Sequence, residues 1–500
     1  MLLNPSFIKL NKVPLLLVLA CTAFYFSFSY NLVRTDYIKL ITLYIALFAL
    51  FYKLIQITKH NFKFLTVMAF LFRAIFIFAI PNLSQDFYRF IWDGRILLEG
   101  INPYLNTVES FITNGEFPVL QTQELYAGMG NLNGSHFTNY PPINQLCFVI
   151  AGLFAGKSIL GSAIVLRLLI IAADFGTLFF GKKLLEKLNI PVYNIFWYIL
   201  NPFIIIELTG NLHFEGVMIF FLVWSLYVLH SGKWQYAAIV FALSISVKLM
   251  PLIFLPLFFQ FFMKHTVIAN NVTVPIDEKP NNKTLENHDE ILKQVQHDDT
   301  KIPAFAGMTK KGMTRLVGFY AIVGITTLLL FAPFFSSEFV NNYTKTVALW
   351  FQNFEFNASF YYLAREIGYM FRGYNEIAII GKVTPILVII VVLILTFFRK
   401  NKTTVELISV MLLALSFYFF TTTTVHPWYV ATLLILSVFT KYKFPLVWSF
   451  VIILSYLAYV NIDKADKSEN LWVIAIEYIV VYSVFFWEIF KRKKNRPLNY

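Results

Sequence analysis

The chain has 500 residues, of which 58% are hydrophobic and only 14% are charged, and its formal net charge is +13. Because soluble domains carry roughly 25% charged residues, this composition excludes an ordinary soluble protein. The positive charges cluster at the ends of apolar segments, as the positive-inside rule requires, so they do not indicate a nucleic-acid partner. The two cysteines, Cys21 and Cys147, lie in apolar runs and give neither a disulfide framework nor metal-ligand spacing.

Apolar runs of about 20 residues cross a ~30 Å hydrocarbon core, and lipid forces such runs to be helical. The sequence therefore predicts an all-α, polytopic helical membrane bundle of about 13 membrane elements, some of them broken. The first apolar segment lacks a small-residue cleavage site, and we expect it to be retained as a helix. The predicted spans are 13–30, 37–57, 62–82, one net crossing within 143–181, 191–210, 216–231, a hairpin over 235–263, then 316–335, 376–398, 404–424, 427–440, 445–461 and 471–490.

Lys and Arg placement predicts the orientation of these spans. Lys9 and Lys12 precede the first span and the basic run 491–496 follows the last, so we expect both termini in the cytoplasm. The basic run is read as a topology anchor or as a binding site for anionic membrane lipids. We expect an N-terminal membrane module (1–263) with a large outer loop (83–141) between spans 3 and 4, and a C-terminal membrane module (316–500).

A polar segment, 264–315, separates the two modules. It is rich in Asn, Asp and Lys, contains no apolar run, and repeats the tripeptide Gly-Met-Thr. Such a composition predicts a disordered cytoplasmic insertion with no catalytic role. His288 and His297 within it do not form a metal-ligand pattern.

The outer loop opens with the sequence SQDFYRFIWDGRILLEGINPY, which holds Asp86, Arg89 and Asp93. On a helix these three side chains share one face. Charged groups at the rim of a membrane bundle are functional candidates, and a carboxylate partly shielded from water can act as a general base. The alternative for Asp86 is a structural salt bridge with Arg89. The loop closes at Tyr140, in a Tyr-Pro-Pro sequence that fixes the entry into the next span.

A second candidate, Lys248, lies in the middle of the predicted hairpin 235–263. An ammonium group in lipid needs an anionic partner. The partner is either the phosphate of a lipid substrate or the carboxylate of Glu207; otherwise the side chain extends to the membrane surface. Arg365 and Arg372, in the outer segment between the spans 316–335 and 376–398, are further candidates for phosphate contact.

Two outer turns complete the candidate site. His213 and Glu215 form a His-x-Glu turn, which either hydrogen-bonds substrate hydroxyls, holds a metal together with His426, or is simply polar. His426 precedes Pro427-Trp428, and Trp428 either stacks on a sugar ring or anchors its helix at the interface.

Several of these motifs together resemble a known class. The pattern S-x-D-x-x-R-x-x-W-D-G from Ser84, followed by G-x-N-P-Y and Y-P-P, resembles polytopic glycosyltransferases of the GT-C class. The bacterial polyprenyl-phosphate-mannose-dependent mannosyltransferases are the most similar group. Asn201-Pro202 and the motifs GNLHFEG, VKLMP and HPWY also look like that group, so the resemblance covers nearly the whole chain apart from 264–315.

The resemblance implies an inverting transfer of a hexose, with mannose as the expected sugar, from a polyprenyl-phosphate donor to a lipid or glycan acceptor. The Lys and Arg placement puts this reaction on the outer face of a bacterial inner membrane, and the sequence assigns no cofactor and no metal site. Asp86 matches the catalytic acid of the class; position 85 is Gln where the class often has a second acid, so Asp93 is the second candidate. For such a reaction we expect Lys248, Arg89 and Arg365 to bind the donor phosphate, and His213, Glu215, His426, Trp428 and Tyr140 to bind the substrate.

A lipid or sugar transporter, or flippase, is the alternative. Broken helices like those predicted at 143–181 and 235–263 also occur in transporters. The sequence shows no internal repeat, and its polar residues lie mainly in outer loops, which favours the enzyme. It also contains neither a Gly-rich phosphate loop nor an Asp-x-Asp motif, so no nucleotide-sugar site is expected.

Overall fold

The computed structural model describes residues 12–268, 310–352, 354–461 and 469–494. The described residues form helices and connecting turns, and the one β-type contact among them is an isolated bridge between Phe356 and Thr424. The predicted all-α class is thus confirmed.

Seven helices among the described residues are long and apolar enough to cross a membrane, or eight if a bent pair counts as one span. Six further apolar helices have only 10–17 residues, so the predicted total of about 13 membrane elements is not confirmed. The seven long helices are α2 (Lys12–Asn31), α3 (Tyr37–Thr58), α9 (Ile159–Lys187), α16 (Lys310–Phe331), α19 (Ile377–Phe398), α20 (Thr404–Thr421) and α23 (Leu471–Lys494).

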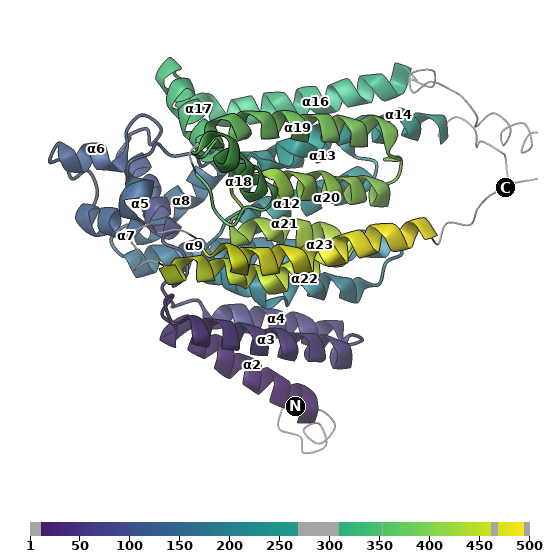
Figure 1. Cartoon of the computed structure of the whole chain (residues 1–500), viewed down its shortest axis with the longest axis horizontal. Coiled ribbons are helices and arrows are strands. Elements are labelled where there is room, and N and C mark those ends of the chain that lie inside the picture. The colour runs from purple at the N-terminus through teal and green to yellow at the C-terminus, as the bar shows by residue number, and fades with distance from the viewer. Residues whose placement is uncertain (1–11, 269–309, 353, 462–468, 495–500) are drawn as a thin grey trace, which may run out of the picture.

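The third predicted span, 62–82, is only partly helical. Helix α4 (Phe62–Ile75) ends after 14 residues, and the chain continues through turns such as the one closed by the Ala79 N–H on the Phe76 carbonyl. Helices α2, α3 and α4 lie side by side (Figure 1). Although α4 is shorter than a full span, the chain runs from one end of the bundle at Phe62 to the other end before it reaches residue 86 (Figure 1).

The predicted span 191–210 is broken at Asn201-Pro202, where its two halves meet at an angle of 48°. Pro202 has no N–H, and the Asn201 side chain caps the next turn by accepting from the Phe203 N–H at 3.0 Å. The second half ends in a π-helical turn, a form that is frequent at functional sites. The elements in order are η1 (Val192–Ile195), α10 (Phe196–Ile199), α11 (Pro202–Ile204) and η2 (Ile205–Gly210).

The predicted hairpin over 235–263 is confirmed. It consists of α13 (Trp234–Val247), η3 (Met250–Leu257) and α14 (Phe258–Ile268). The ring of Trp234 lies 6.5 Å from that of Phe262, and Phe241 lies 5.4 Å from Phe258, so the two arms run antiparallel. Lys248 is at the tip.

The segment 143–181 forms two helices of unequal length, as expected. Helix α8 (Pro142–Ala155) has 14 residues and α9 has 29. Helix α8 packs closely on α5 (Asp86–Leu98). The two helices are so close at Gly94 that a side chain there would overlap the backbone carbonyl of Phe148. The Gly of the Trp-Asp-Gly motif therefore permits the close crossing that fixes α5, and with it Asp86, on the bundle.

The outer segments are helical, which the sequence did not predict. The loop 83–141 contains α5, α6 (Val108–Thr113) and α7 (Thr122–Gly134), and the loop 336–375 contains α17 (Ser337–Gln352) and α18 (Phe360–Arg372). Figure 1 shows α5–α8 and α17 at the same end of the bundle.

The expectation of a disordered insertion over 264–315 lies mainly outside the described residues, as do His288 and His297. Its first five residues, 264–268, belong to α14, and its last six, 310–315, to α16. At both ends the prediction is therefore wrong, because the helices extend beyond the apolar runs.

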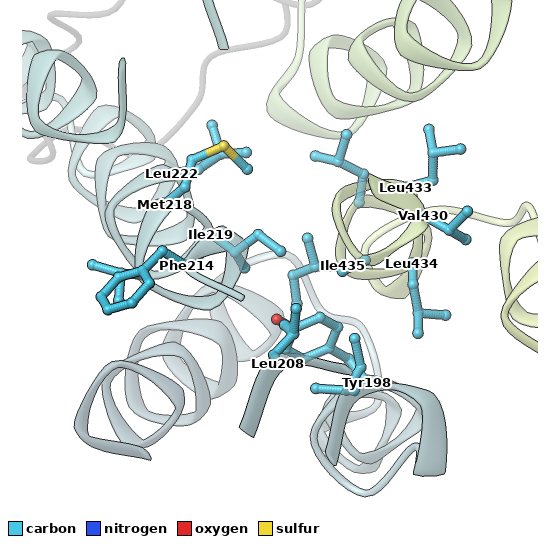
Figure 2. Close-up of a cluster of buried hydrophobic side chains, with 14 of the residues drawn as sticks. Tyr198, Leu208, Phe214, Met218, Ile219, Leu222, Val430, Leu433, Leu434 and Ile435 are labelled. Carbon is cyan, nitrogen blue, oxygen red and sulfur yellow. The ribbon is translucent and has the colours of Figure 1, made fainter. Parts of the chain in front are cut away.

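A buried hydrophobic cluster joins the two halves of the chain (Figure 2). It lies between α12 (Glu215–His230) and α21 (Val430–Val438), with Tyr198 and Leu208 from the broken segment beside them. Because α12 begins at Glu215 and α21 follows the turn η5 (Pro427–Tyr429), this core brings two distant polar turns together. The remaining elements are η4 (Ala332–Phe334), α22 (Phe444–Val451) and η6 (Ile452–Asn461).

A buried ion pair holds α4 against α9. Arg73 Nε lies 2.7 Å from Asp174 Oδ2, and neither side chain is exposed. Removing one partner of such a pair leaves an unpaired buried charge and costs about 3–5 kcal/mol. We therefore expect Arg73→Met to lower the apparent melting temperature of the detergent-purified protein sharply.

The matched control is Lys182→Met, which removes an exposed pair with Glu186 whose charged atoms are 3.5 Å apart. Exposed pairs contribute less than about 1 kcal/mol, so this variant should melt near the wild type. The double variant Arg73→Met/Asp174→Leu should recover part of the loss. Equal melting of Arg73→Met and Lys182→Met would contradict the assignment.

Candidate functional site

A cavity of about 940 Å³ opens where the outer segments, the hairpin tip and the turns before α12 and α21 meet. The outer segment from Asp86, the turn at Glu215 and the turn at His426, which the sequence analysis singled out, all contribute to its wall. Seven of the predicted site residues line it: Asp86, Arg89, Tyr140, Glu215, Lys248, His426 and Trp428. Asp93, His213 and Arg365 do not line it.

Asp86 is the first residue of α5, where the partial positive charge of a helix N-terminus favours a carboxylate. Its Oδ1 accepts a hydrogen bond from Asn133 Nδ2 at 3.2 Å. Burial raises the pKa of Asp86 above its ordinary value, although Lys248, Asn133 and Arg34 oppose this shift. The carboxylate is thus more basic than that of a solvated Asp and faces the cavity.

Arg89 does not pair with Asp86, so the predicted alternative for Asp86 is wrong. The Arg89 Nε lies 2.8 Å from Asp93 Oδ1, one helical turn away. Its Nη1 donates to the backbone carbonyls of Asn133 at 2.6 Å and His136 at 2.9 Å. Arg89 therefore fixes the segment that supplies Asn133 to Asp86.

Asp93 is fully buried, and both of its carboxylate oxygens are paired with other side chains of the protein. Its Oδ2 accepts hydrogen bonds from Thr138 Oγ1 at 2.5 Å and Gln145 Nε2 at 3.1 Å, while Oδ1 pairs with Arg89. The prediction that Asp93 supplies the second catalytic acid is corrected, because no oxygen of this side chain reaches the cavity. It positions Arg89 and the start of α8.

Lys248 pairs with Glu215, not with Glu207 as the sequence suggested. The Lys248 Nζ lies 3.1 Å from Glu215 Oε1, and it also sits 5.3 Å from the centre of the Tyr140 ring. Glu215 is fully buried, and neither of its oxygens accepts a hydrogen bond from the described residues. Glu207 instead accepts from the Tyr456 hydroxyl at 2.9 and 3.0 Å.

A stack of rings ties the two polar turns together. The His426 ring lies 4.6 Å from the Trp428 ring at an interplanar angle of 4°, and Trp428 also stacks on His213 at 3.6 Å. Phe356 stacks on His426 at 5.3 Å. His213 therefore supports Trp428 from outside the cavity wall. The described residues contain no group of three His, Cys, Asp or Glu side chains that could hold a metal ion.

Neither predicted arginine of the outer segment 336–375 reaches the cavity. Arg365 Nη1 lies 2.6 Å from Glu355 Oε1, and its Nη2 lies 3.1 Å from Glu366. The exposed Arg372 pairs with Glu376 at 3.3 Å. Glu355 itself lines the cavity, so Arg365 acts on the cavity wall only through that carboxylate.

Sequence reasoning missed several lining residues, chiefly Arg34, Asn133, Glu355 and Glu469. Arg34 follows the first span directly and is a third cation of this cavity, beside Arg89 and Lys248. Its position was a usable signal, because a lone Arg on the face where basic residues are otherwise scarce departs from the positive-inside pattern.

A family model matches the N-terminal part of the chain. Residues 22–264 match the model described as alpha-(1->6)-mannopyranosyltransferase, N-terminal domain. This part of the chain belongs to that GT-C mannosyltransferase family. It contains Asp86, Glu215 and Lys248. The protein is thus a glycosyltransferase of a mannose-transferring family, and its apolar helices make it an integral membrane protein. No curated protein matches the chain.

Proposed function

We propose that the protein transfers a hexose, mannose, from a polyprenyl-phosphate donor to a lipid or glycan acceptor on the outer face of a bacterial inner membrane. The observation that carries this proposal is that a basic carboxylate, Asp86, and a cation, Lys248, line one cavity among membrane helices. A lipid-phosphate sugar needs both a base for the acceptor and a positive charge for the phosphate.

The reaction follows from these groups. Asp86 takes the proton of the acceptor hydroxyl, and the resulting oxygen attacks the anomeric carbon. The bond between that carbon and the phosphate oxygen breaks through an oxocarbenium-like state, and the polyprenyl phosphate leaves with its negative charge. Lys248, assisted by Arg34, stabilises this charge. A single displacement inverts the anomeric centre.

The apolar part of the cavity wall fits the lipid portion of such a donor. Met250 and Ile253 of η3 and Val388 and Ile389 of α19 line the same cavity as Asp86. An isoprenoid chain gains free energy by leaving water for such a surface. A soluble nucleotide-sugar donor has no apolar chain to cover this part of the cavity wall.

The remaining predicted residues act on the sugar or support those that do. Apart from the ion pair of Oε1 with Lys248, the Glu215 oxygens accept no hydrogen bond from the described residues, so they are placed to accept bonds from sugar hydroxyls. His426, Trp428 and Tyr140 form the adjoining wall, with His213 behind Trp428. Arg89 and Arg365 hold Asn133 and Glu355 in place and do not contact the phosphate in this scheme.

The outward orientation of the cavity rests on charge placement. The segment 83–141 carries six acidic residues against Arg89 and Arg95, whereas basic residues flank the termini, so we assign Asp86 to the outer face and both termini to the cytoplasm. An impermeant thiol reagent applied to intact cells should label a Cys at Glu116, in this outer segment. Labelling only after permeabilisation would reverse the orientation.

The decisive assay uses purified protein in detergent with radiolabelled polyprenyl-phosphate mannose and extracted membrane acceptors. We expect label to move into the acceptor, with polyprenyl-phosphate glucose a poorer donor and GDP-mannose inactive. A transporter, which the bent segment at Asn201-Pro202 also suits, would move lipid across proteoliposomes but transfer no label in detergent. Transfer from GDP-mannose alone would contradict the proposed donor.

The raised pKa of Asp86 predicts the acid limb of the pH profile. The base must be deprotonated to act. Because its pKa is raised, activity should be lost at a higher pH than it would be with a solvated Asp as the base. The Asn133 bond lowers that pKa, so Asn133→Ala should shift the acid limb to still higher pH. Initial rates between pH 4 and 9 test this. If the acid limb of the pH profile is unchanged in Asn133→Ala, Asn133 does not influence the pKa of the base.

A further inference from the structure

Helix α18 has its polar side turned toward the protein. The Tyr361 hydroxyl donates to Glu355 Oε2 at 2.5 Å, and Arg365 pairs with the same carboxylate at 2.6 Å. Tyr362 donates to Glu469. Both carboxylates line the cavity. The inner face of α18 thus consists of polar side chains that hold two acidic groups of the cavity wall.

The outer side of α18 is apolar and exposed. Leu363 is 62% exposed, Ile367 54%, Met370 83% and Phe371 84%. The spacing of these four residues places them in one stripe along the helix. A helix facing water presents its polar side outward, and here the polarity is reversed. The stripe therefore requires an apolar medium or partner.

Helix α18 is followed directly by a membrane-spanning helix. Gly373, in the left-handed conformation (φ 78°), ends α18, and α19 begins four residues later at Ile377. Helices α18 and α19 pack together, and Figure 1 places α18 where α19 begins. The outer face of α19 is also apolar, with Ile386 57% exposed and Ile390 47% exposed. As α19 is long and apolar enough to span the bilayer, its exposed face meets acyl chains.

We propose that α18 is an interfacial helix whose stripe Leu363, Ile367, Met370 and Phe371 is embedded in the acyl-chain boundary of the bilayer. The bilayer is favoured over a protein partner because α18 packs against α19, whose exposed apolar face meets acyl chains. Lipid contact on one side of α18 then fixes Glu355 and Glu469 in the cavity wall on the other. The inference does not depend on which sugar or donor the cavity binds.

Fluorescence quenching in nanodiscs tests this proposal. The full-length protein, with the buried Cys21 and Cys147 replaced by Ala, receives a single Cys at Met370 and a bimane label. Phospholipids carrying nitroxide groups at shallow and deep acyl positions serve as quenchers. The controls are Ile386→Cys on α19 and Glu116→Cys, an exposed residue of the outer segment.

We expect shallow nitroxides to quench the label at Met370 at least roughly threefold more than the label at Glu116, and deep nitroxides to favour Ile386. Ile367→Cys, on the same stripe, repeats the measurement if Met370→Cys does not purify as a monodisperse protein. Water-like emission without quenching at both stripe positions would overturn the proposal. Disulfide cross-linking of two copies through Met370→Cys would also overturn it, because a second chain would then cover the stripe.

Discussion

Replacing Asp86 with Asn should lower the transfer rate by about 10²- to 10⁴-fold, the range that a positioned general base contributes. Asn keeps the size of the side chain and can still contact Asn133, but it cannot take a proton. Binding of the lipid-phosphate donor, which relies on Lys248 and the apolar wall, should be nearly unchanged. Initial rates at saturating donor, together with donor binding measured separately, distinguish these two effects.

The matched control is Asp36→Asn. Asp36 is exposed and caps α3 by accepting from the Lys39 N–H at 3.2 Å. Asn is an equally good N-cap, so this variant should keep the wild-type rate. Wild-type activity in Asp86→Asn would remove this residue from the mechanism, and loss of donor binding in that variant would give it a binding role instead.

Long apolar helices were the most predictable part of the fold. Helix α3 occupies residues 37–58 against a predicted 37–57, and α19 occupies 377–398 against 376–398. Hydropathy identifies such helices because lipid penalises every polar side chain along them. It does not report backbone geometry, so the break at Asn201-Pro202 and the early end of α4 at Ile75 were not predicted.

Helices α17 and α18 were missed for a different reason. Their apolar and polar residues alternate with helical periodicity, so their average hydropathy is low and the segment 336–375 resembles a loop. Only the arrangement in space shows that the polar side of α18 faces inward, toward Glu355.

The site was predictable where a charge stands in an apolar or rim context, as for Asp86, Lys248 and His426. The pairing of these charges was not. Glu207 and Glu215 are eight residues apart and equally plausible partners for Lys248 in the sequence. The π-helical turn η2 directs Glu207 to Tyr456, and only Glu215 remains within reach of Lys248. Arg34 was missed because it lies in the turn after α2, far from the outer motif in sequence.

Replacing Lys248 with Met should lower the transfer rate by about 10²- to 10³-fold, because the departing phosphate loses its cation in a site of low dielectric. The same change leaves the buried Glu215 without its ion pair, so protein stability should fall as well. Lys233→Met, at the exposed opposite end of α13, is the matched control and should keep both activity and stability.

The double variant Lys248→Met/Glu215→Gln separates the two roles of this lysine. The single variant Glu215→Gln is the reference for rate, because Glu215 also contacts the sugar in this scheme. If Lys248 served only to neutralise Glu215, the double variant would match Glu215→Gln in both stability and rate. If Lys248 binds the phosphate, the double variant recovers its melting temperature but transfers more slowly than Glu215→Gln alone, and Lys248→Arg regains part of the rate. Rates and melting curves of these variants in one detergent decide the point. A double variant as active as Glu215→Gln alone would contradict the proposed role of Lys248 and assign the departing phosphate to Arg34.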